Sequence, residues 1–131
     1  MTVRIFSFSY KHGLSSDLGP DGGGFVVDCR ALPNPFWVEN LRGFTGRDQP
    51  IIGFFAVHAD AVAAFLKPVE DLVRNSIAAY AQDARERLSV GFGCTGGKHR
   101  SVYCAEALAG ALRGDGGVTV ELVHTALQTV R

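Results

Sequence analysis

The sequence has 131 residues, the size of one ordinary domain, and 47% of them are hydrophobic while 20% are charged. This balance is typical of a packed globular domain and excludes a disordered chain. Thirteen basic residues match thirteen acidic ones, so the sequence lacks the overall positive charge of most nucleic-acid-binding domains, although a local basic patch stays open. We expect residues 1–131 to form a single domain.

The sequence carries no recognisable targeting, membrane or metal signal. Its N-terminus lacks the apolar core and cleavage site of a signal peptide, and no stretch approaches the ~20 apolar residues that cross a bilayer. The cysteines are Cys29, Cys94 and Cys104, an odd set without paired spacing, which argues against a disulfide framework or a zinc ribbon. We therefore predict a cytoplasmic protein with no metal site, no cofactor and no membrane partner, in which Cys29 and Cys104 are small buried residues.

Two strands and two loops are predicted at the start of the sequence. The β-branched and aromatic run from Val3 to Tyr10 predicts a first strand, and Gly24 to Cys29 predicts a second. Between them, Ser15 to Gly24 is rich in Ser, Gly, Asp and Pro, which predicts a mobile loop. Two prolines flank an asparagine within residues 28–37, so we expect a stiff loop there, with Trp37 in the core rather than serving as a platform for a sugar.

Helical patterns occupy the middle of the sequence. Asp48-Gln49-Pro50 predicts a helix start, because a capping residue precedes a proline in the first turn; a strand is the alternative for the apolar residues that follow. From Ala61 to Tyr80, apolar residues recur at helical spacing, which predicts a long amphipathic helix. Pro68 lies inside that pattern, and we expect it to kink or restart the helix.

The last third of the sequence predicts a strand, a helix and another strand. Leu88 to Phe92 has the composition of a short buried strand, a helix begins near Arg100 and ends at the glycines of residues 114–117, and Val118 to Val123 predicts the next strand. Two parallel strands joined in this way require a right-handed crossover. Together the elements predict an α/β fold, Rossmann-like and three-layered, with a mostly parallel or mixed sheet.

The loop between that strand and helix carries the strongest functional signal. Ligands of open α/β sheets bind beyond the carboxyl ends of the strands, where loops run into helix N-termini. Adjacent glycines let backbone N–H groups approach an anion, and the helix N-terminus adds unpaired donors and partial positive charge. We expect Arg100 to face solvent in the free protein, where its guanidinium can grip two phosphate oxygens. The predicted phosphate-type anion site comprises Cys94, Thr95, Gly96, Gly97, Lys98, His99, Arg100 and Ser101.

Polar residues on neighbouring loops are further candidates for this site. Lys11 and His12 follow the first strand and are expected at the rim. Asp28 and Arg30 end the second strand, where they either contact the ligand or pair with each other. Asn34 is held between two prolines and either orients sugar hydroxyls or caps a turn.

Two alternatives stay open for the glycine-rich loop. It is an ordinary turn, or it is the site of a cysteine-dependent phosphatase, because Cys94 and Arg100 have the spacing of the nucleophile and the arginine in those enzymes. Against the phosphatase, Gly93 stands where such signatures carry histidine. The candidate general acids, Asp60 and Asp71, both lie within the helical pattern.

Short motifs spread over nearly the whole sequence also carry a resemblance to a known family. They are Ser7-Phe8-Ser9-Tyr10-Lys11-His12-Gly13, Asp28-Cys29-Arg30, Leu32-Pro33-Asn34-Pro35 with Trp37, Leu41-Arg42, Thr45-Gly46, Asp48 and Pro50, Gly93-Cys94-Thr95-Gly96-Gly97-Lys98-His99-Arg100-Ser101-Val102-Tyr103, and His124. In these motifs the sequence resembles the C-terminal domain of the bacterial RNase adapter protein RapZ and its relatives, the YvcJ family of nucleotide-binding proteins.

The resemblance implies a Rossmann-like domain that senses a phosphorylated amino sugar, glucosamine-6-phosphate, and that in RapZ proteins also binds small RNAs and presents one to a ribonuclease. This sequence ends Thr125-Ala126-Leu127-Gln128-Thr129-Val130-Arg131, without the basic cluster tied to RNA contact, so strong RNA binding is not expected. It contains no G-x-x-x-x-G-K-[ST] motif, so ATP or GTP binding by a P-loop is not expected either.

We therefore predict a non-catalytic, stand-alone sensor of a small phosphorylated metabolite, with an amino sugar phosphate as the first candidate and an adapter role to be considered. A phosphatase that uses Cys94 and Arg100 is the first alternative, and a small-RNA-binding adapter is the second. A second copy of the chain, in a homodimer, is a further candidate partner.

Overall fold

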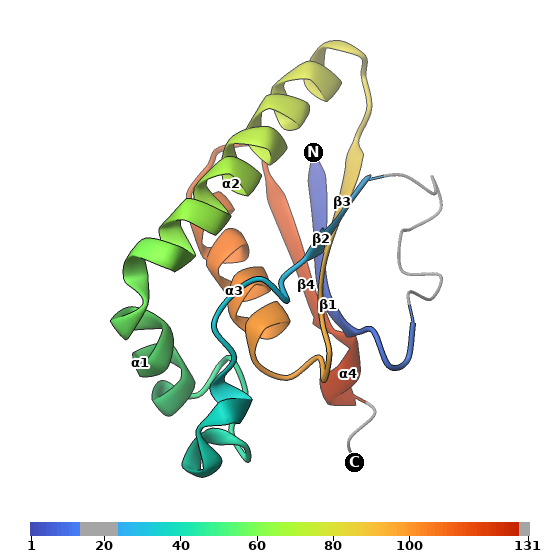
Figure 1. Cartoon of the computed structure of the whole chain (residues 1–131). Coiled ribbons are helices and arrows are strands. Elements are labelled where there is room, and N and C mark those ends of the chain that lie inside the picture. Colours follow the sequence, from blue (N-terminus) through green and yellow to red (C-terminus); the bar gives the residue numbers. More distant parts are fainter. Residues whose placement is uncertain (14–23, 129–131) are drawn as a thin grey trace.

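The computed structural model describes residues 1–13 and 24–128, and Figure 1 shows how its elements are arranged. The strands are β1 (Thr2–Ser9), β2 (Gly24–Asp28), β3 (Arg87–Cys94) and β4 (Thr119–His124). The helices are α1 (Gln49–Val57), α2 (Ala59–Gln82), α3 (Arg100–Leu112) and α4 (Thr125–Gln128), and two short 3-10 helices, η2 (Pro35–Trp37) and η3 (Glu39–Leu41), precede them. The loop predicted over Ser15 to Gly24 lies outside the described residues, except for Gly24, which begins β2.

The described strands form one parallel sheet in the order β2-β3-β1-β4. Ile5 in the middle of β1 lies opposite Val90 of β3 on one side and Leu122 of β4 on the other. Parallel neighbours need long crossovers, and helices provide them: α1 and α2 join β2 to β3, and α3 joins β3 to β4. The fold is therefore α/β and Rossmann-like, in agreement with the three-layer class expected from the sequence.

The two central strands pack tightly against each other through an aromatic and glycine pattern. Phe6 and Phe8 of β1 are buried, and their rings lie over Gly91 and Gly93 of the neighbouring strand. A Cβ atom at either glycine would come within 2.5 Å of a phenylalanine ring, so only glycine fits at these two positions. This packing keeps β3 extended as far as Cys94, two residues beyond the predicted end at Phe92.

Helices α1 and α3 begin where the sequence predicts, whereas α2 begins at Ala59, two residues before the predicted start, and α4 was not predicted. Helix α1 starts after Asp48, and Asp48 Oδ2 accepts a hydrogen bond from the backbone N–H of Thr45. Helix α2 runs through Pro68 without restarting, so the predicted restart there is wrong. Proline removes only its own N–H donor, and the flanking turns of a 24-residue helix keep theirs. The chain breaks instead at His58, between α1 and α2.

Within the described residues, no single helix has both the length and the apolar composition needed to cross a bilayer. Helices α1 and α2 meet that criterion only when taken together, and they are bent by 95° where they join.

Candidate ligand-binding site

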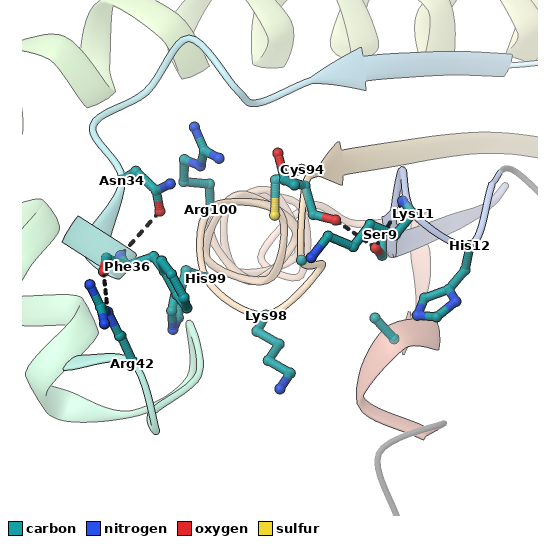
Figure 2. A pocket seen from close by; sticks show the side chains of 13 residues that line it. Ser9, Lys11, His12, Asn34, Phe36, Arg42, Cys94, Lys98, His99 and Arg100 are labelled. Atoms are coloured by element: carbon teal, nitrogen blue, oxygen red, sulfur yellow. Dashed lines mark hydrogen bonds between the residues drawn. The ribbon is translucent and has the colours of Figure 1, made fainter. Parts of the chain in front are cut away.

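A cavity of about 420 Å³ opens where β1 and β3 end, beside the N-terminus of α3 (Figure 2). Four segments surround it: the end of β1 with the loop after it, the segment between β2 and α1 that contains the 3-10 helices, helix α4, and the glycine loop, defined here as residues 93–101. The described residues that line it are Ser9, Lys11, His12, Asn34, Phe36, Arg42, Cys94, Thr95, Gly96, Lys98, His99, Arg100 and Ala126. The structure thus brings together nine of the thirteen predicted site residues.

The two adjacent glycines of the loop have different roles. Gly96 lines the cavity, and no atom lies within 4 Å of the position that a Cβ would take there, so its backbone is open to a ligand. Gly97 is buried, has a left-handed φ of +70°, and packs against Ser9 and Ala126. Ser9 also holds the loop through its hydroxyl, which donates to the carbonyl of Thr95 at 2.6 Å. Gly96 therefore exposes the backbone, while Gly97 shapes the turn.

The charged side chains that line the cavity are all basic. They are Lys11, Arg42, Lys98 and Arg100, and no carboxylate occurs among the described lining residues. Arg42 is held in place, because its Nε donates to the carbonyl of Phe36 at 2.7 Å and its guanidinium stacks on the Phe36 ring at 4.6 Å. In a chain of zero formal net charge, this local excess of cations favours an anionic ligand.

His99 joins the glycine loop to the segment that follows η3. Its Nε2 lies 2.7 Å from the carbonyl oxygen of Phe44, so this nitrogen carries the hydrogen and donates. Burial lowers the pKa of His99, which keeps the imidazole neutral at pH 7. The backbone N–H of Gly46 donates to the carbonyl of Lys98 at 2.8 Å and strengthens the same junction. Residues 44–46 are therefore fixed against the glycine loop.

Arg100 does not face solvent, and that expectation is wrong. Its side chain is buried, with 6% of the residue exposed, and Nη1 donates to the carbonyl oxygens of Arg30 at 2.8 Å and Leu32 at 3.3 Å. Prolines 33 and 35 lack N–H groups, so the segment after β2 has few donors of its own. A buried carbonyl left without a donor costs about 1–3 kcal/mol, which Arg100 avoids by turning toward this segment.

Cys94 lies at the floor of the cavity, and Ser101 lies behind it. The thiol donates to Ser101 Oγ at 3.1 Å, and the backbone N–H of Ser101 points at Cys94 Sγ at 3.4 Å. Ser101 is completely buried and does not line the cavity, although it was predicted at the site. This arrangement supplies hydrogen bonds to a thiol or a thiolate. The two candidate general acids of a phosphatase do not line the cavity: Asp60 lies in the first turn of α2, and Asp71 pairs with Lys67.

Asp28 and Arg30 pair with each other outside the cavity lining. The closest atoms of the two side chains are 2.7 Å apart, and the Arg30 guanidinium stacks on the ring of Tyr10 at 4.1 Å. The hydrogen bonds from Arg30 hold the pKa of the Asp28 carboxyl below its ordinary value. The sequence left two roles open for Asp28 and Arg30, ligand contact or an ion pair, and the structure contains the ion pair.

Four lining residues were missed from the sequence: Ser9, Phe36, Arg42 and Ala126. The motif Leu41-Arg42 was an available signal for the arginine. Trp37 was expected in the core but is 76% exposed, because η2 turns Pro35 inward and leaves Trp37 on the surface.

His124, the last residue of β4, is buried and hydrogen-bonded at both ring nitrogens. Nε2 lies 2.7 Å from a carboxylate oxygen of Glu106, and Nδ1 lies 2.6 Å from the hydroxyl of Ser7. Because an ionised carboxylate only accepts, Nε2 donates to Glu106 and Nδ1 accepts from Ser7 in the neutral ring. This network ties β1 and β4 to α3 behind the glycine loop.

Comparison of the sequence with known proteins identifies the family of this chain. The chain is 44% identical over 129 residues to a nucleotide-binding protein of Ruegeria pomeroyi, covering 98% of the chain and 43% of that protein. It is 42% identical over 116 residues to one of Bifidobacterium adolescentis, covering 88% and 36%, and 39% identical over 127 residues to one of Thermobifida fusca, covering 97% and 41%. The chain spans about two fifths of the length of these curated relatives. The family model of the RapZ C-terminal domain matches residues 1–128, and the chain therefore belongs to the RapZ C-terminal domain family.

Proposed function

We propose that this domain is a non-catalytic sensor that binds a small phosphorylated metabolite in the cavity beside the glycine loop. The observation that carries the proposal is the lining itself: its charged side chains are all Lys or Arg, Lys98 lies beside the open backbone of Gly96, and no carboxylate occurs among the described lining residues. Cationic side chains and backbone N–H groups at a helix N-terminus are the donors that bind phosphate groups. Ser9, Phe36, Arg42 and Ala126, which were not predicted from the sequence, also line the cavity, and Phe36 adds an aromatic ring.

An amino sugar phosphate, with glucosamine-6-phosphate as the first candidate, is the ligand that we propose. The resemblance to RapZ proteins supports it, and a volume of about 420 Å³ lies within the range of small-molecule sites. Lys98 and the backbone at Gly96 are suited to the phosphate, and Asn34 and Phe36 on the opposite segment are suited to the sugar. The relatives are named nucleotide-binding proteins, so nucleoside monophosphates are the next ligands to test after the sugar phosphates.

Calorimetric titration tests this proposal with four compounds: glucosamine-6-phosphate, glucose-6-phosphate, inorganic phosphate and glucosamine. We expect the phosphorylated compounds to bind and unphosphorylated glucosamine not to bind. In a thermal-shift assay, a ligand at a hundred times its Kd adds about 2.7 kcal/mol to the stability of the folded state. Failure of every phosphorylated compound to bind would refute the sensor.

A cysteine-dependent phosphatase is the second candidate, favoured by the position of Cys94 in the cavity lining. Its thiol donates to the hydroxyl of Ser101 and accepts from the backbone N–H of the same residue. In that mechanism the thiolate attacks phosphorus, the P–O bond to the leaving alcohol breaks, and water then hydrolyses the S–P bond of the phosphocysteine to release phosphate and regenerate the thiolate. We expect wild-type protein to release no phosphate from sugar or aryl phosphates, and Cys94→Ser to bind within about tenfold of wild type. Phosphate release that disappears in Cys94→Ser would establish the enzyme instead.

A further inference from the structure

Arg100 and Lys98 stand two residues apart in the glycine loop but point in different directions (Figure 2). The Lys98 side chain is half-buried at the cavity, and no carboxylate partner for its ammonium group is found in residues 1–13 and 24–128. Arg100 instead turns toward the segment after β2, where Nη1 donates to the carbonyls of Arg30 and Leu32 at 2.8 and 3.3 Å. One cation thus faces the ligand space, while the other is engaged with the protein backbone.

The segment that Arg100 holds is a wall of the cavity, here called the proline wall and defined as residues 30–36. Its two prolines have fixed φ angles, so an anchor near its start determines where its end lies. The anchored carbonyl of Leu32 is followed two residues later by Asn34, whose Oδ1 accepts from the backbone N–H of Phe36 at 3.1 Å. Asn34 and Phe36 both line the cavity, so the contacts of Arg100, together with the burial of Leu32 and Pro35, help to hold this lining in position.

The phosphate side of the cavity does not depend on these contacts. The glycine loop follows directly from β3, and it is held at its base by the hydrogen bond from Ser9 to Thr95 and by the packing of Gly97. Lys98 extends from this loop, and its carbonyl is held by Gly46. Removing the Arg100 guanidinium therefore loosens the start of the proline wall, at the carbonyls of Arg30 and Leu32, and leaves the anion donors in place.

From this geometry we infer that Arg100 is a positioning residue that gives the site its selectivity for the part of the ligand beyond the phosphate. It holds the proline wall against α3 so that Asn34 and Phe36 meet the sugar, while the glycine loop and Lys98 bind the phosphate group. This inference rests on the proposed function, and it assigns Arg100 to a different part of the ligand from the one expected from its charge.

Calorimetry with two probes, inorganic phosphate and glucosamine-6-phosphate, separates the two roles. We expect Arg100→Met to bind inorganic phosphate within about twofold of wild type and glucosamine-6-phosphate at least about tenfold more weakly. Lys98→Met should lose affinity for both probes by a similar factor, because it removes a phosphate contact. Arg113→Met is the matched control: Arg113 is exposed just after the last turn of the same helix, and its loss should change neither affinity.

Equal losses of both probes in Arg100→Met would show that Arg100 contacts the phosphate, and unchanged binding of both would show that the proline wall does not act in binding. Either result overturns the inference. If the wild type binds neither probe, the proposed function fails and the inference falls with it. If Arg100→Met does not fold, nuclear magnetic resonance of wild-type protein with isotope-labelled arginine decides. Inorganic phosphate should then leave the Arg100 guanidinium signals unshifted, and a shift at saturation overturns the inference.

Discussion

Replacing Gly97 by alanine should destabilise the fold, although the change adds only one methyl group. Gly97 has a φ of +70°, a left-handed conformation that costs a residue with a Cβ about 1–2 kcal/mol. The added Cβ would also lie 2.6 Å from Cβ of Ala126 and 2.9 Å from Cβ of Ser9. Both neighbours belong to elements that are packed in place, β1 and α4, so relief requires the loop or α4 to shift.

The expected loss of stability combines the backbone strain and the steric overlap at residue 97, and it is reduced by an effect on the unfolded chain. Overpacking of a tight site costs about 1–3 kcal/mol in addition to the backbone strain. Alanine also restricts the unfolded chain, which returns about 0.4–1 kcal/mol. We therefore expect Gly97→Ala to lower the free energy of unfolding by about 1 to 5 kcal/mol, measured by urea denaturation followed by circular dichroism.

Gly96→Ala is the matched control, because nothing lies within 4 Å of its Cβ position and its φ is not left-handed. Its free energy of unfolding should stay within about 0.5 kcal/mol of wild type or rise slightly. Combining Gly97→Ala with Ala126→Gly should recover part of the loss, because the closest contact is removed. A difference below about 0.5 kcal/mol between the two single alanine variants would refute the steric reasoning.

Three further measurements test other parts of the structure. Burial lowers the pKa of His99 and of His124, so the unfolded chain takes up protons first as the pH falls below about 6.5, and stability should drop there. Urea midpoints at about pH 7.5 and 5.5 measure this drop, and His124→Gln should reduce it; equal midpoints in wild type would contradict the assignment. Trp37→Ala should change stability by no more than about 0.5 kcal/mol, because the side chain is largely exposed, and a larger loss in urea denaturation would mean that it is buried in solution. Gel-shift titration at about 150 mM salt should find no nanomolar RNA affinity, and a nanomolar Kd would show that a local basic patch compensates for the missing basic cluster.

The sequence by itself determined the order and type of most elements and the location of the site. The β-branched and aromatic run in β1 and the helical spacing of apolar residues in α2 are local patterns, and each favours its secondary structure wherever the chain packs against a core. The glycine loop was also predictable, because Gly96 and Gly97 follow a strand and precede a helix in consecutive residues. Lys11 and His12 were placed at the rim by the same rule, since they follow the end of a parallel strand.

Only the tertiary structure decided the direction of side chains whose partners are distant in sequence. Arg100 donates to carbonyls 68 and 70 residues away, and His99 donates to one 55 residues away, so no local pattern indicates either contact. The exposure of Trp37 and the presence of Arg42 at the cavity depend in the same way on how the segment before α1 packs beside the glycine loop. A charge in a glycine loop therefore predicts an anion site, but whether that charge meets the ligand or a buried carbonyl depends on which donors and acceptors the rest of the fold leaves unpaired.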